Sequence, residues 1–144
     1  MEQTKHLLYS YLRLTQHMSR QFRNYFDQPE LTMPQMMVLT ALSEEGNMPI
    51  SRLAQYIGSA NSTVSGIVDR LEKMGLVERI RSEEDRRVIY VGLTAKYRAK
   101  KKTDVTVSAY LGKQLSGLSE QEFSEIRTAI EKLDAVLKQA GERC

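Results

Sequence analysis

The chain has 144 residues, of which 41% are hydrophobic, so it can bury one core of ordinary size. Its only cysteine is the last residue, Cys144, and its two histidines, His6 and His17, lie eleven residues apart on one predicted helix. These counts exclude a disulfide framework and leave no Cys/His cluster with metal-ligand spacing, so we expect neither a metal nor a cofactor.

The net charge of +3 permits a nucleic-acid partner without arguing for one. No apolar run approaches the roughly 20 residues that span a bilayer, and the first residues lack the pattern of a signal peptide. We therefore expect a cytoplasmic protein with no membrane partner.

The first predicted element is a long amphipathic helix over residues 3–26. Its apolar positions recur every three or four residues, at Leu7, Tyr11, Leu14, Met18, Phe22 and Tyr25. Thr32 and Gln35 form a capping-box pattern for a second helix, Met33 to about Leu42, and Gly46 is expected to end that helix in the left-handed conformation.

Two shorter helices follow an extended piece at residues 48–50. Ser51 is expected to cap the first, which Gly58 ends, and Ser59 is expected to cap the second, over residues 60–74. The inward face of the second helix carries Val64, Ile67, Val68 and Leu71. Two helices joined by a tight turn that contains glycine indicate a helix-turn-helix.

The sequence period changes after Gly75, where "LVERIR" and "RVIYVGL" have strand length and composition and "SEED" lies between them as a turn. We therefore predict a hairpin whose second strand runs from Val88 to Leu93. Thr94 is expected to cap a helix to about Leu115. Within it, the basic run "KYRAKKK", residues 96–102, is interpreted as a solvated helix face slightly ahead of a phosphate contact.

The last predicted helix begins with a capping box formed by Ser119 and Glu122. Its apolar stripe keeps heptad spacing at Phe123, Ile126, Ile130, Leu133 and Leu137. The middle of the chain is too small to bury the stripes of both terminal helices. The economical solution is that these helices pack against each other and against a second copy of the chain.

The expected fold is mainly α with a small β-hairpin wing, a winged helix-turn-helix flanked by long N- and C-terminal dimerisation helices. We expect a single domain over residues 1–144. It consists of a helical dimerisation region at 1–30 and 99–144 and a lobe at 31–98, with the helix-turn-helix at about 50–74 and the wing at about 76–93.

The outward arc of the helix over residues 60–74 is small and rich in hydroxyl groups. It carries Ser62, Ser65, Gly66 and Asp69, with Thr63 and Arg70 flanking, and Asn61 lies near the N-terminus of the helix. Short polar side chains of this kind suit a helix that enters the major groove, and a glycine there lets the backbone approach closely. The alternative is that these residues merely cap and solvate an ordinary helix start, which we would favour for an isolated helix.

The neighbouring hairpin changes that balance, because its tip is expected to gather Arg79, Arg81, Arg86 and Arg87 beside the acidic residues 83–85. Charged tips also discourage edge-to-edge aggregation. An arginine on a protruding hairpin beside a groove-reading helix has a more specific use, since the narrow minor groove attracts guanidinium groups. Together the two elements favour DNA binding.

Residues 50–94, and above all the wing signature Asp85-Arg86-Arg87 and the pattern "VDRLEKMGLVER", resemble the MarR family of bacterial transcription factors. The resemblance implies a homodimer, built from the first and last helices, that binds a palindromic operator in double-stranded DNA, with repression as the expected outcome. It also implies that Arg87 enters the minor groove, that Asp85 braces the wing through an ion pair, and that Arg86 contacts backbone or base edge. Asn61, Ser62, Thr63 and Ser65 would then read bases and phosphates. Gly66 departs from the longer polar or basic residue frequent in the family.

The resemblance further implies release by a small aromatic or phenolic effector. Candidates to line its cleft are Tyr9, His17, Met18, Arg20, Met33, Met36 and Met37. Met and Tyr suit an adaptable apolar pocket, and His17 or Arg20 would hold a carboxylate. For any one of them, an ordinary core or surface role is the stronger interpretation. A cysteine-based redox switch is disfavoured, because the first helix contains no cysteine.

The alternative function is a winged-helix protein–protein interaction module without specific DNA binding, which would require an exposed apolar recognition surface. An enzyme is least expected, because no nucleophile, base and orienting group occur at plausible positions and no phosphate-binding loop is visible.

Overall fold

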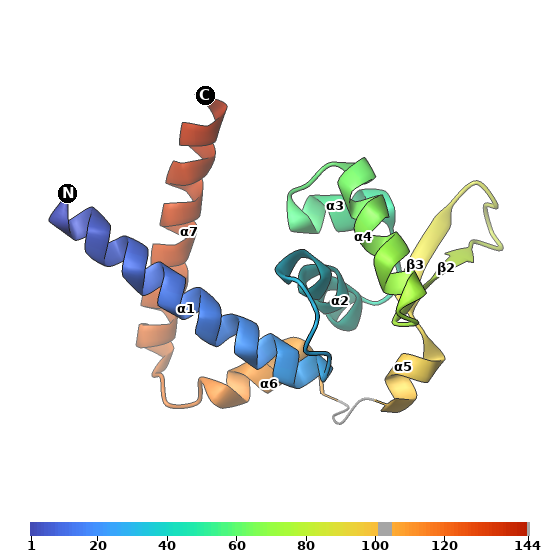
Figure 1. The fold of residues 1–144 in the computed structure, drawn as a ribbon, viewed down its shortest axis with the longest axis horizontal. Coiled ribbons are helices and arrows are strands. Elements are labelled where there is room, and N and C mark those ends of the chain that lie inside the picture. Colours follow the sequence, from blue (N-terminus) through green and yellow to red (C-terminus); the bar gives the residue numbers. More distant parts are fainter. Residues whose placement is uncertain (101–104, 144) are drawn as a thin grey trace. The chain divides into compact units, whose positions relative to one another are not determined.

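The computed structural model describes residues 1–100 and 105–143. The described residues are mainly helical, with a small antiparallel sheet (Figure 1). Contacts along the chain divide it into two compact units, Met1–Tyr110 and Leu111–Cys144, and each is described by itself.

The first helix, α1 (Glu2–Phe26), is buried only near its C-terminal end. Tyr25 and Phe26 are 2% exposed and belong to the core of the first unit. The helix ends at Asp27, which adopts the left-handed conformation and donates its N–H to the carbonyl of Arg23. The N-terminal half of α1 therefore keeps its apolar side chains outside this core.

The second helix, α2 (Met33–Glu45), begins with the predicted capping box. Gln35 donates its backbone N–H to Thr32 Oγ1 at 3.3 Å, and Thr32 donates its own to Gln35 Oε1 at 2.9 Å. The helix continues three residues beyond Leu42, the predicted end. Gly46 has a positive φ of 82° but a ψ of −165°, so the predicted left-handed conformation at this position is wrong.

The helix-turn-helix consists of α3 (Ile50–Ile57) and α4 (Asn61–Lys73). Gly58 ends α3 in the left-handed conformation, as predicted. The predicted serine caps are wrong, because Pro49 and Ala60 occupy the two N-cap positions and neither forms a side-chain cap. Ser51 already lies inside the first turn, and Ser59 donates its N–H to the carbonyl of Ala54, which ties it to the end of α3.

Gly75 ends α4 with a positive φ of 78°, as predicted, and Leu76 then donates its N–H to the carbonyl of Leu71. The chain continues into β2 (Val77–Arg81) and β3 (Ile89–Leu93), which form the predicted antiparallel hairpin. The second strand begins one residue later than predicted, because Val88 closes the turn by donating to the carbonyl of Asp85.

The extended piece predicted at residues 48–50 is a third strand, β1 (Met48–Pro49). It pairs with the free edge of β3, where Met48 lies opposite Val91, and gives the order β1-β3-β2. This pairing attaches the start of the helix-turn-helix to the hairpin.

The single helix predicted from Thr94 to about Leu115 is wrong, because Val105 and Thr106 are not helical. The described residues form α5 (Ala95–Lys100), capped as predicted by Thr94, and α6 (Val107–Gln114). Thr106 Oγ1 accepts the N–H of Ala109, which starts the second helix. Of the basic run, Lys101 and Lys102 lie outside the described residues.

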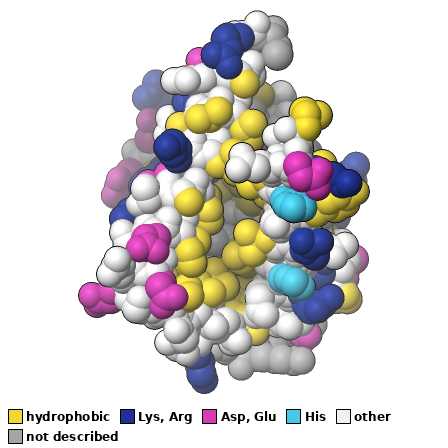
Figure 2. Space-filling model, turned by 90° about the vertical axis from the view of Figure 1, so that its left-hand side faces the viewer, with side chains coloured by type: hydrophobic (Ala, Val, Ile, Leu, Met, Phe, Trp, Pro, Cys, Tyr) yellow, Lys and Arg dark blue, Asp and Glu magenta, His cyan; other side chains and the backbone are white. Residues whose placement is uncertain are grey.

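The last helix, α7 (Glu120–Glu142), begins with the predicted capping box of Ser119 and Glu122, and hydrogen bonds from Ser119 lower the pKa of the Glu122 carboxyl. No residue of α7 is buried in the described structure. Within its predicted stripe, Leu133 is half-buried, and the exposed fractions of the other four side chains range from 46% at Phe123 to 60% at Leu137. On α1, Leu7, Tyr11 and Leu14 are 48–54% exposed. Figure 2 shows hydrophobic side chains gathered in bands on the face turned to the viewer.

The core of the first unit lies where α2, α3, α4 and the sheet meet. Leu39, Leu53, Val64, Val68, Leu71 and Val91 are all 0% exposed. In the described part of the chain, no helix is long and apolar enough to cross a membrane.

Candidate nucleic-acid interface

The face of α4 that points away from the core is polar. Asn61, Ser62, Thr63, Gly66 and Arg70 are exposed and Ser65 is half-buried. These six residues form the recognition-helix face, opposite the buried Val64, Val68 and Leu71. In the described structure, the N-cap residue of α4, Ala60, forms no side-chain cap, and free N–H groups at a helix N-terminus suit an anion such as a phosphate.

Gly66 lies in the middle of the recognition-helix face, and a Cβ atom built there would meet no atom within 4 Å. Packing therefore does not require glycine at this position. An open hollow of about 550 Å³ runs beside it, lined on one side by Thr63, Gly66, Ile67 and Arg70. The space beside Gly66 lets the backbone of a partner come close to α4.

The wing is the β2–β3 hairpin, and Asp85 organises its tip. Asp85 Oδ1 accepts the backbone N–H and the Nε–H of Arg87, both at 3.1 Å, and Oδ2 accepts from Nη2 at 3.2 Å. These bonds hold the pKa of the Asp85 carboxyl below its ordinary value. The Arg87 side chain is nevertheless 90% exposed, so the ion pair orients the guanidinium without burying it.

Two further contacts brace the same loop. Arg81 donates from Nη1 to the carbonyl of Arg86, and Asp85 donates its N–H to Ser82 Oγ at 3.2 Å. The Arg81 guanidinium therefore forms its hydrogen bond within the hairpin. Arg86 and Arg87 are the exposed arginines of the tip, beyond the ends of the strands.

Arg79 does not join the basic tip, and that expectation is wrong. Its guanidinium pairs with Asp69 at 2.8 Å and with Glu72 at 2.9 Å, and Nη2 also lies 3.4 Å from Ser65 Oγ. We call this group the Arg79 clasp. It joins β2 to α4, so the wing and the recognition helix are held together in the same lobe (Figure 1).

The sequence contained a signal for this clasp. Asp69 and Glu72 are three residues apart and therefore share a helix face. Arg79 sits on the strand that directly follows that helix. Arg79 therefore pairs with both acidic residues of that helix face.

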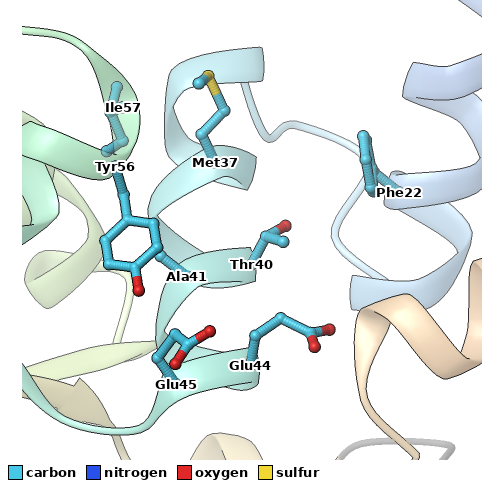
Figure 3. Close-up of a pocket in the computed structure, with 8 residues that line it drawn as sticks. All are labelled: Phe22, Met37, Thr40, Ala41, Glu44, Glu45, Tyr56 and Ile57. Carbon is cyan, nitrogen blue, oxygen red and sulfur yellow. The ribbon is translucent and has the colours of Figure 1, made fainter. Parts of the chain in front are cut away.

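The seven effector candidates do not gather around one cavity in the first unit. Met36 is 1% exposed in the core, and Tyr9 and His17 are exposed on α1. Arg20 lines a separate hollow beside Arg23 and Pro29. Met18 and Met33 are half-buried. Of the seven, only Met37 lines the cavity between α1, α2 and α3 that is drawn in Figure 3.

The fold and this polar helix–wing face together define a winged helix-turn-helix DNA-binding regulator as the class of protein. Residues 31–89 match the MarR family. The chain is 46% identical over 65 residues to the uncharacterised helix-turn-helix regulator YfiV of Bacillus subtilis. The matched stretch covers 45% of this chain and only 41% of that protein. It is 28% identical over 123 residues to the organic hydroperoxide resistance regulator of the same species, covering 85% and 82% of the two chains.

Solved structures extend the likeness over most of the chain. A probable transcriptional regulator from Pseudomonas aeruginosa superposes with a TM-score of 0.60 at 27% identity, over 88% of this chain and 96% of that one. The MepR–DNA complex of Staphylococcus aureus gives 0.64 at 22% identity, over 90% and 96%, and therefore shows the fold.

The winged helix-turn-helix part of the chain, residues 31–89, thus matches the MarR family, and the relatives and solved structures that resemble the chain over most of its length are transcriptional regulators. This is a family of DNA-binding regulators and not of enzymes.

Proposed function

We propose that the protein is a homodimeric transcriptional repressor that binds a palindromic operator and is released from it by a small-molecule effector. In this proposal α4 enters the major groove, Arg87 enters the adjacent minor groove, and Asn61, Ser62, Thr63 and Ser65 contact bases and phosphates. The division into a helical dimerisation region and a winged lobe, and a cytoplasmic location, belong to the same proposal.

The observation that carries this proposal is the combination of an exposed polar recognition-helix face with the exposed, Asp85-oriented Arg87 beside it. Short hydroxyl and amide groups reach base edges, and a guanidinium suits the negative potential of a narrow minor groove. The MepR structure, which shares the fold, is itself a DNA complex. No large hydrophobic side chain of α4 is exposed in the described residues, which disfavours the protein–protein interaction module.

Dimerisation is supported by the apolar stripes of α1 and α7. Leu7, Leu14, Ile126, Ile130 and Leu137 are each about half exposed in the single chain. Exposed apolar stripes on long helices are typical of an interface that a second copy covers.

The experiment that tests the proposal is selection of bound sequences from random duplex DNA by the full-length protein. We expect a palindrome whose half-site centres lie about 34 Å apart, one turn of the duplex. Enrichment of a non-palindromic site would contradict the symmetric dimer. Failure to enrich any sequence would overturn the assignment of specific DNA binding. Repression is tested separately, with a reporter gene placed behind the selected operator.

A further inference from the structure

A cavity of about 280 Å³ lies inside the first unit, where α1, α2 and α3 approach one another. Its apolar wall comes from Phe22, Met37, Tyr56 and Ile57. Glu44 and Glu45, from the last turn of α2, line it as well, and Figure 3 places their two carboxylates at one end, away from Met37 and Ile57. The cavity thus has an apolar end and a carboxylate end.

The charge of this wall has one sign. Among the described residues that line the cavity there are two glutamates and no lysine, arginine or histidine. The guanidinium of Arg52 lies 5.9 Å from the centre of the Tyr56 ring, but Arg52 is not a lining residue. Glu45 has no ion-pair partner among the described residues. A ligand with its own carboxylate would therefore be repelled at the carboxylate end.

Glu44 has a second role at the same time. Its Oε1 accepts the backbone N–H of Ser108 at 2.6 Å, and its Oε2 accepts the Ser108 hydroxyl at 2.7 Å. Ser108 lies in the first turn of α6, so Glu44 holds the N-terminus of that helix from α2. The helix continues past Tyr110 into the second unit of the chain. One carboxylate therefore both lines the cavity and holds the N-terminus of α6, and both contacts lie within the first unit.

We propose that this cavity is the site of a small effector that carries an aromatic ring and a positive charge, and that its cation competes with the N-terminus of α6 for Glu44. The inference rests on the proposed function and names the chemical class of its effector. It reverses the charge expected from the resemblance alone, which pointed to a phenolic or carboxylate ligand.

The physical argument is the fit between the two ends of the cavity and the two ends of such a molecule. The ring buries its apolar area against Phe22, Met37 and Ile57. The ammonium lies between the glutamates and beside the Tyr56 ring, where both a carboxylate and an aromatic face attract it. When Glu44 turns to the ammonium, it weakens its hold on α6.

The test uses three probes with the same ring and chain but different charge: 4-phenylbutylamine, 4-phenylbutan-1-ol and 4-phenylbutyrate. Binding to the full-length protein without DNA is measured by calorimetry, and the Met37 methyl signal in an NMR spectrum reports the location. We expect the amine to bind at least about 10-fold more tightly than the alcohol, and the carboxylate more weakly than both. Equal or tighter binding of the carboxylate overturns the proposal, as does binding that leaves the Met37 signal unchanged.

Variants then assign the preference to the two glutamates. Glu45→Gln and Glu44→Gln should each lower the affinity for the amine towards that for the alcohol, while Glu30→Gln, an exposed carboxylate on the loop before α2, should leave it unchanged. Glu45→Asp keeps the charge and should retain the preference, which guards against a variant that misfolds. An amine affinity that survives both glutamine substitutions contradicts the proposed site.

Competition with α6 has its own test. Ser108→Ala removes one of the two groups that occupy Glu44, so the amine should bind more tightly to this variant. Unchanged or weaker binding contradicts the competition. Because these measurements contain no DNA, they separate the two proposals. If the protein enriches an operator but does not bind the amine, only the proposed effector site is contradicted. If the protein binds the amine but enriches no DNA sequence, only the proposed function is contradicted.

Discussion

Arg87 combines two properties that rarely occur together: a fixed guanidinium and nearly full exposure. Asp85 accepts two hydrogen bonds from the Arg87 guanidinium and one from the Arg87 backbone N–H. The Arg87 side chain is nevertheless 90% exposed and contributes nothing to the core. Arginine keeps the same charge at every relevant pH, so the group presented to a partner is constant. The Arg87 side chain therefore acts through what it contacts outside the chain.

Arg87→Ala is expected to weaken operator binding and to leave folding unchanged. If the lost contact neutralises one phosphate, the slope of log affinity against log salt becomes shallower by about 0.9. Gel shifts over a salt series and a thermal melt measure the two properties, with Arg127→Ala on α7 as the charge-matched control. A salt series identical to that of the unaltered protein would remove Arg87 from the interface.

Tyr97 is a second informative residue, because it is 4% exposed and its hydroxyl has no hydrogen-bond partner among the described residues. Burial, followed by the nearby Tyr25 and Asp27, raises the pKa of the phenol above its ordinary value of 10.0. The folded state therefore favours the neutral phenol. Its contribution to stability is complete below about pH 10 and declines as the pH rises further, where the unfolded chain ionises more easily.

Tyr97→Phe is expected to leave the free energy of unfolding at pH 7 unchanged or to raise it by about 1 kcal/mol, since it removes a buried polar group without a partner. The loss of stability between pH 9 and pH 11 should be smaller in the variant than in the unaltered protein. Urea unfolding at the two ends of that range measures both effects. A variant that is less stable by more than about 1 kcal/mol at pH 7 would show that the hydroxyl makes a favourable interaction.

At the scale of secondary structure, the Arg79 clasp is an ion-pair contact between a strand and a helix. It joins β2 to α4, and its side chains are only partly exposed, from 25% at Arg79 to 57% at Asp69. Exposed ion pairs contribute little individually, so its main effect is to connect β2 to α4 and to neutralise two acidic residues beside the proposed DNA contact.

Arg79→Met is expected to cost about 1 kcal/mol of stability and to reduce operator affinity by more than that loss explains, because Asp69 and Glu72 then repel the phosphates. Adding Asp69→Asn and Glu72→Gln should restore part of the affinity. Lys132→Met on α7 controls for net charge. Chemical unfolding and gel shifts measure the two quantities, and affinity unchanged by Arg79→Met would limit the clasp to a structural role.

Capping boxes and terminal glycines made most helix boundaries predictable. Thr32 with Gln35 and Ser119 with Glu122 form the bonds their spacing predicts, and Gly58 and Gly75 adopt the positive φ values that end α3 and α4. Isolated serines were poor guides, because Pro49 and Ala60 occupy the N-cap positions that Ser51 and Ser59 were expected to fill. A single hydroxyl competes with many alternatives, whereas a reciprocal pair specifies one geometry.

At the scale of the whole molecule, the described chain leaves its two longest helices incompletely buried. α7 buries no residue, and the apolar positions of α1 are exposed over its N-terminal half. Helices of this length gain most of their stability from packing of an apolar face. The two stripes therefore account for the proposed assembly of two copies.

Ile130→Glu is expected to shift the protein from dimer to monomer and to weaken operator binding with it, since two linked half-sites then bind independently. Ile130 is 55% exposed in the single chain, so the substitution should leave the fold of the first unit intact. Thr128→Glu places the same charge on the opposite face of α7 and serves as the control. Sedimentation and circular dichroism measure assembly and folding, and a dimer that tolerates Ile130→Glu would place the interface elsewhere.

The sequence by itself determined the order of the helices up to the hairpin, the hairpin and the polar face of α4, because each depends on residues close together in the chain. An ion pair of Asp85 was implied by the family resemblance, and the structure identified Arg87 as its partner. Tertiary structure decided what depends on distant residues. It paired β1 with β3, directed Arg79 to α4, and placed Glu44 against Ser108, 64 residues away. Hydrophobic periodicity and capping patterns predict only the local conformation of the backbone. The partner of a charged side chain is set by packing between elements, which no local pattern encodes.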